Sequence, residues 1–199
     1  RDISQNAVSG KLRLGIPDDH GQAKLAEIIA TFTRQHPKVE LEVTCALSTG
    51  FPDGLDKGML DLAIYEVERP KRHEEVLFED PTCWVSSTHW KVPVGESLPV
   101  ALFDHACWWR DAAIASLEAR GKPYRIVYSS QSVSGVIAAV EAGIAVGLLG
   151  RSSLHSGLSV IGEGLRFNST PASKLVMAAN ASQEDGPLMA MKSTIRATF

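Results

Sequence analysis

The segment from Tyr124 to Gly150 has the pattern of a strand, a helix and a second strand joined by very short connections. Residues 125–129 contain β-branched side chains typical of a strand, and residues 144–149 form a continuous apolar run typical of a strand buried on both faces of a parallel sheet. Between them, Ser132 suits a helix N-cap and Gly143 suits a left-handed C-cap. The apolar side chains of this helix recur on one face, at Val133, Val136, Ile137 and Val140. These residues predict a β-α-β unit.

Such a unit directs the N-terminus of its helix toward the crevice beyond the carboxyl end of the first strand. Unpaired N–H groups and a partial positive charge at that end favour a carboxylate or a phosphate, by about 0.3 to 1 kcal/mol before any side-chain bond forms. Ser130, Gln131 and Ser132 lie there and are candidate ligand-binding residues. Plain capping is the alternative interpretation, and it applies most to Ser132.

The rest of the chain repeats this alternation of strands and helices. Apolar spacing predicts strands at 11–16, 39–45, 61–65, 98–103 and 175–178, and helices at 22–35, 52–57, 110–120 and from Gly186 onward. The highly charged residues 66–75 are expected to form a surface excursion. The extended stretch 76–87, interrupted by Pro81, suits a strand that leaves one sheet and joins another.

We therefore predict an α/β protein with two small Rossmann-like subdomains, joined by two crossover segments. Subdomain I is assembled from both ends of the chain, residues 10–82 and 160–199, and subdomain II comprises residues 83–159. A ligand cleft between the two subdomains is the expected consequence of this arrangement.

Composition excludes several classes of protein. The net charge of −3 comes with no long basic run, so nothing in the chain is expected to bind a nucleic-acid backbone unaided. No apolar run approaches the length of a membrane span, and the first residues lack the apolar core of a signal peptide. The chain begins without Met, which suggests a fragment of a longer protein. Three cysteines without a C-x-x-C pair favour a reduced, cytoplasmic setting.

Three motifs resemble the effector-binding domain of LysR-type transcriptional regulators. They are F-x-x-x-x-P-x-V-x-L-x-V at residues 32–43, G-x-L-D-L-A-I at residues 58–64 and V-x-A-G-I-A-V at residues 140–146. The resemblance extends from Gly10 to the last helix. It implies a periplasmic-binding-protein type II-like fold with a small-molecule effector in the cleft between the subdomains.

The same resemblance implies partners. In this family an N-terminal winged helix-turn-helix binds DNA, and that domain is absent from this chain. The helix at 22–35 and the strand at 39–45 would pack against the helix at 133–142 of an antiparallel second copy, giving a homodimer, and a tetramer in the full-length protein. Charge reversal at the exposed Glu40 and Glu42 is expected to weaken such a dimer. The effector would act by favouring one relative orientation of the subdomains.

Polar residues follow the predicted strands of subdomain I where a ligand would bind. The candidates are Asp18, Asp19, His20, Ser48, Thr49, Tyr65 and Glu66. The first three form the loop after the first strand and suit an amine, although one aspartate is also a natural cap for the next helix. A metal site is not expected, because no second cluster of His or carboxylate residues has ligand spacing.

In subdomain II, Trp108 and Arg110 open a helix. Arg110 suits a bidentate bond to an anion, and a cation at a helix start is otherwise disfavoured by the helix dipole. Trp108 or the adjacent Trp109 is a candidate cleft residue, with a core position as the alternative. Cys83 and Cys107 are expected to be small buried hydrophobes rather than a redox pair.

No enzyme motif is complete. The sequence at 132–135 lacks the leading Gly of a nucleophile elbow, and residues 143–150 lack the Lys of a phosphate-binding loop. We therefore predict an effector sensor without catalytic activity or cofactor. A solute-binding protein of a transporter and a small α/β enzyme such as a dehydratase are the alternatives.

Overall fold

The chain of 199 residues forms two compact units. The computed structural model describes residues 8–18, 22–93, 95–104, 107–161, 165, 167–182 and 184–199. Unit 1 combines the N-terminal part of the chain through Phe78 with the C-terminal part from Lys174, and unit 2 runs from Glu79 to Ser173. Each unit contains one five-stranded sheet, so the predicted α/β fold is confirmed.

The sheet of unit 1 has the strand order β2-β1-β3-β10-β4. These strands are β1 (Gly10–Pro17), β2 (Val39–Ala46), β3 (Leu62–Val67), β4 (Glu75–Asp80) and β10 (Ser173–Ala179). β1 pairs in parallel with both β2 and β3, whereas β10 runs antiparallel to β3. The carboxyl ends of β1, β2 and β3 therefore share one edge of the sheet.

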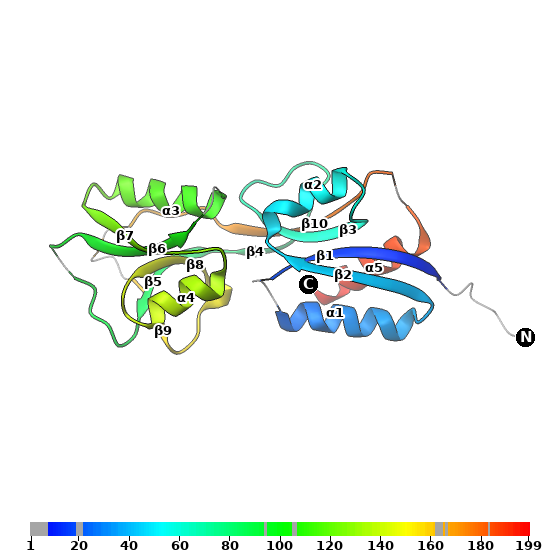
Figure 1. The fold of residues 1–199 in the computed structure, drawn as a ribbon, viewed down its shortest axis with the longest axis horizontal. Helices are drawn as coiled ribbons and strands as arrows, with labels where there is room; N and C mark the ends of the chain where they lie inside the picture. Colours follow the sequence, from blue (N-terminus) through cyan, green and yellow to red (C-terminus); the bar gives the residue numbers. More distant parts are fainter. Residues whose placement is uncertain are drawn as a thin grey trace, which may run out of the picture. The chain divides into compact units, whose positions relative to one another are not determined.

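Two helices cover one face of this sheet and a third covers the other (Figure 1). α1 (Gln22–Gln35) and α5 (Gly186–Thr198) contribute apolar side chains to the larger core. α2 (Phe51–Asp56) covers the opposite face in a smaller core. The helical periodicity of α1 is confirmed by its buried side chains Leu25, Ile28 and Phe32.

Asp61 joins β3 to β1 through Arg13. Its side chain is 4% exposed and accepts three hydrogen bonds from Arg13: from the main-chain N–H at 2.7 Å, from Nε at 3.1 Å and from Nη2 at 2.6 Å. Burial raises the pKa of the Asp61 carboxyl, but the hydrogen bonds and charge of Arg13 outweigh burial and hold that pKa below its usual value. Asp61 is thus an anchor before β3 rather than the first residue of the strand.

The sheet of unit 2 has the strand order β7-β6-β8-β5-β9. These strands are β5 (Thr82–Ser87), β6 (Leu98–Phe103), β7 (Tyr124–Ser130), β8 (Val146–Gly150) and β9 (Leu158–Val160). β6 pairs in parallel with β7 and β8, and β5 runs antiparallel to β8 and β9. β4 and β5 flank Pro81 and belong to different sheets, which confirms the predicted crossing.

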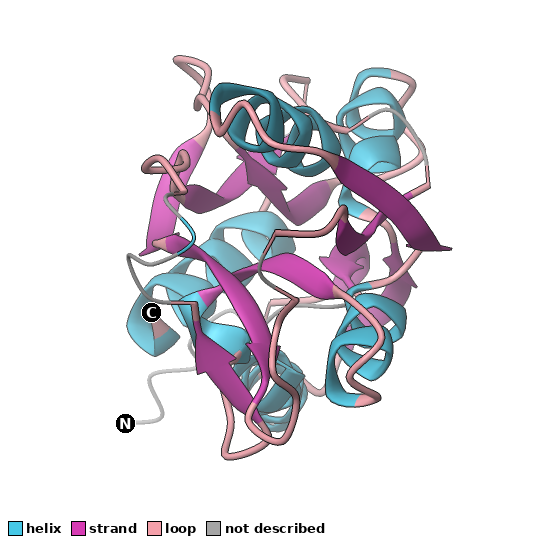
Figure 2. Cartoon of the chain, turned by 90° about the vertical axis from the view of Figure 1, so that its left-hand side faces the viewer, coloured by secondary structure: helices cyan, strands magenta, loops and turns pink. Residues whose placement is uncertain are grey.

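Two helices lie on opposite faces of the unit 2 sheet (Figures 1 and 2). α3 (Trp108–Ala119) and α4 (Val133–Glu141) each pack into a separate apolar core. α3 begins two residues before the predicted start at Arg110. β8 begins at Val146 rather than at Ile144, because Gly143 adopts a left-handed turn with φ of 69° and Ile144 beside it is 48% exposed.

The second crossing between the units lies later in the chain than predicted. The sequence pattern predicts the boundary between residues 159 and 160, whereas the compact unit 2 extends through Ser173. Phe167 stacks on buried Trp84 with ring centroids 4.6 Å apart, and Arg120 donates from Nε to the carbonyl of Leu165 at 2.9 Å. These contacts between residues far apart in sequence hold the returning segment on unit 2.

Candidate functional site

The carboxyl ends of β6, β7 and β8 lie at one edge of the unit 2 sheet, because β6 pairs in parallel with both neighbours. The main-chain N–H of Asp104, just beyond β6, donates to the carbonyl of Ser130 at 3.1 Å and ties the first two strand ends together. Helices α3 and α4 start from the same edge. Arg110 and the predicted residues 130–132 thus belong to one region of unit 2.

The start of α4 is held by serine hydroxyls. Ser132 accepts a hydrogen bond from the main-chain N–H of Gly135 at 3.2 Å, so its predicted N-cap role is confirmed. The hydroxyl of Ser130 accepts from the N–H of Ser132 and donates to the carbonyl of Ser132, both at 3.1 Å. Gln131 is exposed. Both serine hydroxyls are therefore used in building the turn, and their contact with a ligand stays a prediction.

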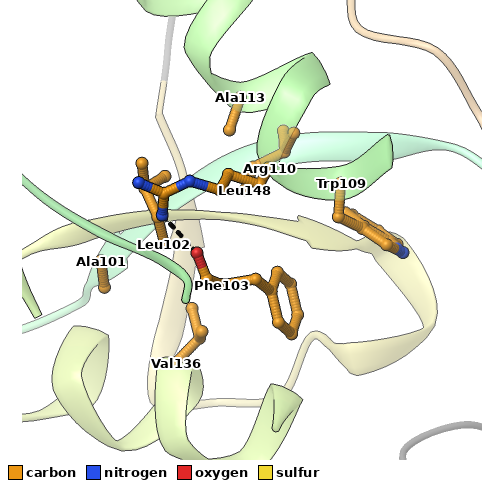
Figure 3. A pocket seen from close by; sticks show the side chains of 8 residues that line it. All are labelled: Ala101, Leu102, Phe103, Trp109, Arg110, Ala113, Val136 and Leu148. Atoms are coloured by element: carbon orange, nitrogen blue, oxygen red, sulfur yellow. Dashed lines mark hydrogen bonds between the residues drawn. The ribbon is translucent and has the colours of Figure 1, made fainter. Parts of the chain in front are cut away.

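Arg110 extends from α3 across the end of β6 (Figure 3). Its Nη1 donates to the main-chain carbonyl of Phe103, the last residue of β6. A small pocket surrounds this contact, lined by Ala101, Leu102, Phe103, Trp109, Arg110, Ala113, Val136 and Leu148. Arg110 is the one charged residue among these eight. Trp109 lines the pocket. Trp108 does not line it, and its ring lies tilted against that of Trp109 with ring centroids 4.6 Å apart.

A second group of predicted residues gathers at the carboxyl edge of the unit 1 sheet. The main-chain N–H of Asp18 donates to the carbonyl of Ala46 at the end of β2, at 3.2 Å. The hydroxyl of Ser48 accepts from the main-chain N–H of Glu66 at 3.2 Å, and Thr49 beside it is exposed. Asp19 and His20 lie outside the described residues. The first, second and third strands thus bring Asp18, Ser48 and Glu66 to one edge.

Tyr65 has a structural role in this arrangement. Its side chain is 1% exposed and packs in the smaller core of unit 1. The hydroxyl donates to the carboxylate of buried Glu74 at 2.8 Å, and Glu74 also accepts from the main-chain N–H of Lys71 at 2.6 Å. Burial and the neighbouring Glu74 carboxylate raise the pKa of Tyr65. Tyr65 therefore anchors the charged loop 66–75, and this accounts for its position without a ligand.

The three cysteines are free thiols. Cys83 is buried and Cys107 is partly buried, and burial raises the pKa of each thiol above its usual value. A redox sensor needs an exposed thiol with a lowered pKa, and both Cys83 and Cys107 differ from this in burial and in the direction of the pKa shift. Cys45 on the edge strand β2 is exposed.

Two contributors to the unit 2 site, and one buried carboxylate of unit 1, carry no signal of their role in the sequence. The acceptor for Arg110 is a main-chain carbonyl, which any residue at position 103 would supply. Val136 reaches the pocket from α4, where its spacing alone marks it as a core residue. Glu74 was hidden among the charged residues expected to be solvated, yet it is 8% exposed.

No group of three or more His, Cys, Asp or Glu side chains in the described ranges is arranged to hold a metal ion. Similarly, none of the helices of the described part is long and apolar enough to cross a membrane. The polar groups at the carboxyl edges of the two sheets are hydrogen-bond donors and acceptors, and Arg110 adds a guanidinium at the unit 2 edge. They suit the binding of a small polar or charged molecule.

The two-unit α/β fold is that of an effector-binding domain. Residues 5–189 match the model of the LysR substrate binding domain, and the chain therefore belongs to this family. The resemblance noted in the three sequence motifs is confirmed by this match.

Two curated relatives are regulators. The chain is 24% identical over 198 residues to the HTH-type transcriptional regulator DgdR of Burkholderia cepacia, covering 100% of this chain and 67% of DgdR. It is 27% identical over 188 residues to the HTH-type transcriptional regulator PecT of Dickeya dadantii (strain 3937), covering 94% of this chain and 60% of PecT. The chain thus corresponds to a part of these longer proteins.

Solved structures of LysR-family regulators share the fold. The reduced form of the regulatory domain of OxyR2 from Vibrio vulnificus superposes with a TM-score of 0.71 at 16% identity, covering 100% of this chain and 98% of that one. HinK, a LysR family transcriptional regulator from Pseudomonas aeruginosa, gives a TM-score of 0.72 at 16% identity, covering 96% of this chain and 71% of HinK. These likenesses establish the periplasmic-binding-protein type II-like fold.

Proposed function

We propose that this domain senses a small anionic or zwitterionic metabolite, which binds through polar groups at the carboxyl edges of the two sheets. The observation that carries this proposal is the placement of a guanidinium beside helix starts at the unit 2 edge, which also carries Asp104. Arg110 and the start of α4 both lie there, and no ion pair joins Arg110 to a described carboxylate. Positive charge at a strand-end crevice favours an anion.

The unit 1 edge brings Asp18, Ser48, Thr49 and Glu66 together, with main-chain hydrogen bonds at Asp18 and Glu66. We propose that carboxylate and hydroxyl oxygens of this group bind a cationic group such as an ammonium. Acting as a sensor requires that the ligand prefer one arrangement of the protein over another. A nearly complete switch needs about 5.5 kcal/mol of differential affinity.

We further propose that two copies associate through α1 and β2 of one and α4 and β7 of the other. β2 and β7 are edge strands of their sheets. The edge strand β7 exposes apolar side chains, and a register shift beside Val100 leaves one of them, Val127, without a partner residue on β6. The exposed fractions are 43% for Ile126, 37% for Val127 and 36% for Tyr128. Exposed apolar strand edges favour pairing with a partner.

Charge supports this pairing. Glu40 on β2 is 77% exposed, and Glu42 is 58% exposed although its carboxylate contacts Lys11 at 2.7 Å. Arg125 on β7 is exposed and offers an opposite charge. Reversing Glu40 and Glu42 to Lys should therefore weaken dimers, which sedimentation over a dilution series measures. Unchanged dissociation on dilution would contradict the proposed interface.

The whole protein is proposed to be a DNA-binding transcriptional regulator that acts in the cytoplasm, as a tetramer built from such dimers. Its DNA contacts would come from a segment outside this chain. We assign no catalysis to the domain, because DgdR and PecT are described as regulators. The transporter alternative has no support among these relatives.

A thermal-shift screen tests the ligand proposal. The domain is heated with organic acids, amino acids and phosphates, each at millimolar concentration. We expect members of at least one class to raise the melting temperature, and Gln131→Ala to reduce the shift without changing the melting temperature of the free protein. A screen in which no class stabilises the domain would contradict the proposal.

A further inference from the structure

The loop between β3 and β4 concentrates positive charge on unit 1. Four of the five residues 69–73 are Arg, Lys or His, in a chain whose net charge is −3. Lys71, Arg72 and His73 are exposed, and the side chain of Arg69 is 89% exposed. Within the described part of the chain, neither Lys71 nor Arg72 forms an ion pair. The charge of this loop is therefore available to a partner.

The carboxylates on either side of the loop do not neutralise it. Glu75 accepts two hydrogen bonds of 2.7 Å from Arg196, so its charge is already paired. Glu68 contacts Arg69 at 3.8 Å, and an exposed pair at that separation contributes little. Lys174 on β10 adds a cation at the base of the loop, because its Nζ donates to the carbonyl of Glu68 at 3.3 Å. The loop and its base thus keep a net positive charge.

A buried carboxylate fixes the shape of the loop. The main-chain N–H of Glu74 donates to the carbonyl of Lys71 at 3.0 Å and closes a turn with Arg72 and His73 at its tip. Glu74 is 8% exposed, and its carboxylate accepts from the N–H of Lys71 at 2.6 Å and from the hydroxyl of Tyr65 at 2.8 Å. A backbone already held in one conformation loses less freedom when its side chains bind a partner. The turn therefore presents its cations from a fixed base.

The side chains of this loop suit a phosphate backbone better than a protein surface. Protein interfaces depend on buried aromatic and apolar anchors, and residues 69–73 contain no Phe, Tyr, Trp, Met or aliphatic side chain beyond Pro70. Contacts to nucleic-acid phosphates need cations alone, and Arg can bind phosphate oxygens through two parallel bonds. A few such contacts give weak binding, in agreement with the expectation that no part of this chain binds a nucleic-acid backbone unaided.

We infer that the loop at residues 69–73 contacts the phosphate backbone of duplex DNA, in addition to the contacts proposed for the segment outside this chain. The inference rests on the proposed function, because it needs DNA that is held by that segment. Lys71 and Arg72 make the contact, and Glu74 positions the turn that carries them. Phosphates carry no sequence information, so the loop adds affinity without changing which operator is chosen.

The test measures binding of this domain to a fluorescent duplex DNA of mixed sequence, by anisotropy over a range of salt concentrations. The loop variant combines Lys71→Gln with Arg72→Gln, and its urea midpoint should equal that of the wild type. The matched control combines Lys91→Gln with Lys122→Gln, because both lysines are exposed residues of unit 2 and the net charge changes equally. A poly-glutamate peptide is the second probe.

We expect the wild type and the control to bind the duplex at low salt, with log affinity falling against log salt at a slope of about −3. The loop variant should bind about tenfold or more weakly, and its slope should be smaller by about two. Equal weakening of the loop variant and the control, or no binding at low salt, would overturn the inference. Loop-dependent binding of poly-glutamate that is tighter than binding of the duplex would also overturn it, because the partner would then be an acidic protein segment. Any of these failures leaves the effector proposal to its own screen, which does not involve the loop.

Discussion

Replacing Asp61 by Asn should destabilise unit 1 more than any other single loss of charge at a described ion pair. The asparagine amide at this position would keep one acceptor oxygen for the N–H of Arg13 but would turn an NH₂ donor toward the guanidinium. Because Nε of Arg13 shares that retained oxygen, the bond lost outright is the one from Nη2 at 2.6 Å, and the bond from Nε at 3.1 Å loses its charge assistance, at a side chain that is 4% exposed. Breaking such a buried pair costs about 3 kcal/mol, the lower part of the usual range, because Arg13 is 32% exposed.

Urea unfolding of both proteins measures this difference. We expect the midpoint to fall without a change in the slope, and the melting temperature to drop by about 6 to 12 °C for a chain of this size. Asp53→Asn is the matched control. Its carboxylate contacts Lys57 at 2.8 Å, but both side chains are more than 60% exposed, so its loss should cost about 0.5 kcal/mol. Equal effects of the two substitutions would refute the assignment of Asp61 as an anchor.

The pH dependence provides a second measurement of the same contact. Because the pKa of Asp61 is lowered in the folded protein, its contribution to stability is fully present above the unfolded pKa of about 3.9. The contribution declines as the pH falls through the folded pKa. The stability difference between the wild type and Asp61→Asn should therefore be constant near neutral pH and shrink below about pH 4. A difference that grows on acidification would contradict the sign of the shift.

Three further predictions use single sites. A thiol reagent should modify exposed Cys45 quickly and buried Cys83 only on unfolding, so Cys45→Ser should remove most of the fast phase. Gly135→Ala should lower the melting temperature, because its Cβ would clash with Ser130 Oγ, and Ser130→Gly in the same chain should restore much of the loss. Tyr65→Phe should cost about 1 to 3 kcal/mol in urea unfolding by leaving one oxygen of the buried Glu74 carboxylate without its donor, and an unchanged midpoint would contradict this role.

Local rules explain why much of the fold was predictable from sequence. The start and end of α4 follow from Ser132 and Gly143, because the cap and the left-handed turn each involve residues only a few positions apart. The positions of the strands follow from their apolar patterns, because shifting the pairing register of a strand by one residue would expose its buried side chains. The short-range part of the candidate site, residues 130–132, was found for the same reason.

Long-range contacts explain what was missed. The boundary of unit 2 depends on Phe167 stacking against Trp84, a pairing that no periodicity encodes. The burial of Glu74 depends on Tyr65, which is nine positions earlier and on a different element. A run of charged residues predicts a solvated loop. Glu74 in this run is nevertheless buried, because the hydroxyl of buried Tyr65 needs an acceptor.

The serine cluster shows why residue type alone does not separate capping from ligand binding. A hydroxyl at a helix start has the same chemistry in both roles, and the outcome depends on which acceptors and donors lie nearest. The Ser130 hydroxyl occupies the space that a Cβ at position 135 would need, and Gly135 leaves this space open. The hydroxyl therefore bonds to the main chain of Ser132, both as donor and as acceptor. The guanidinium of Arg110 has five N–H donors, and the carbonyl of Phe103 accepts from one of them. Recognition of an anion is therefore expected to depend more on the arginine than on the serines.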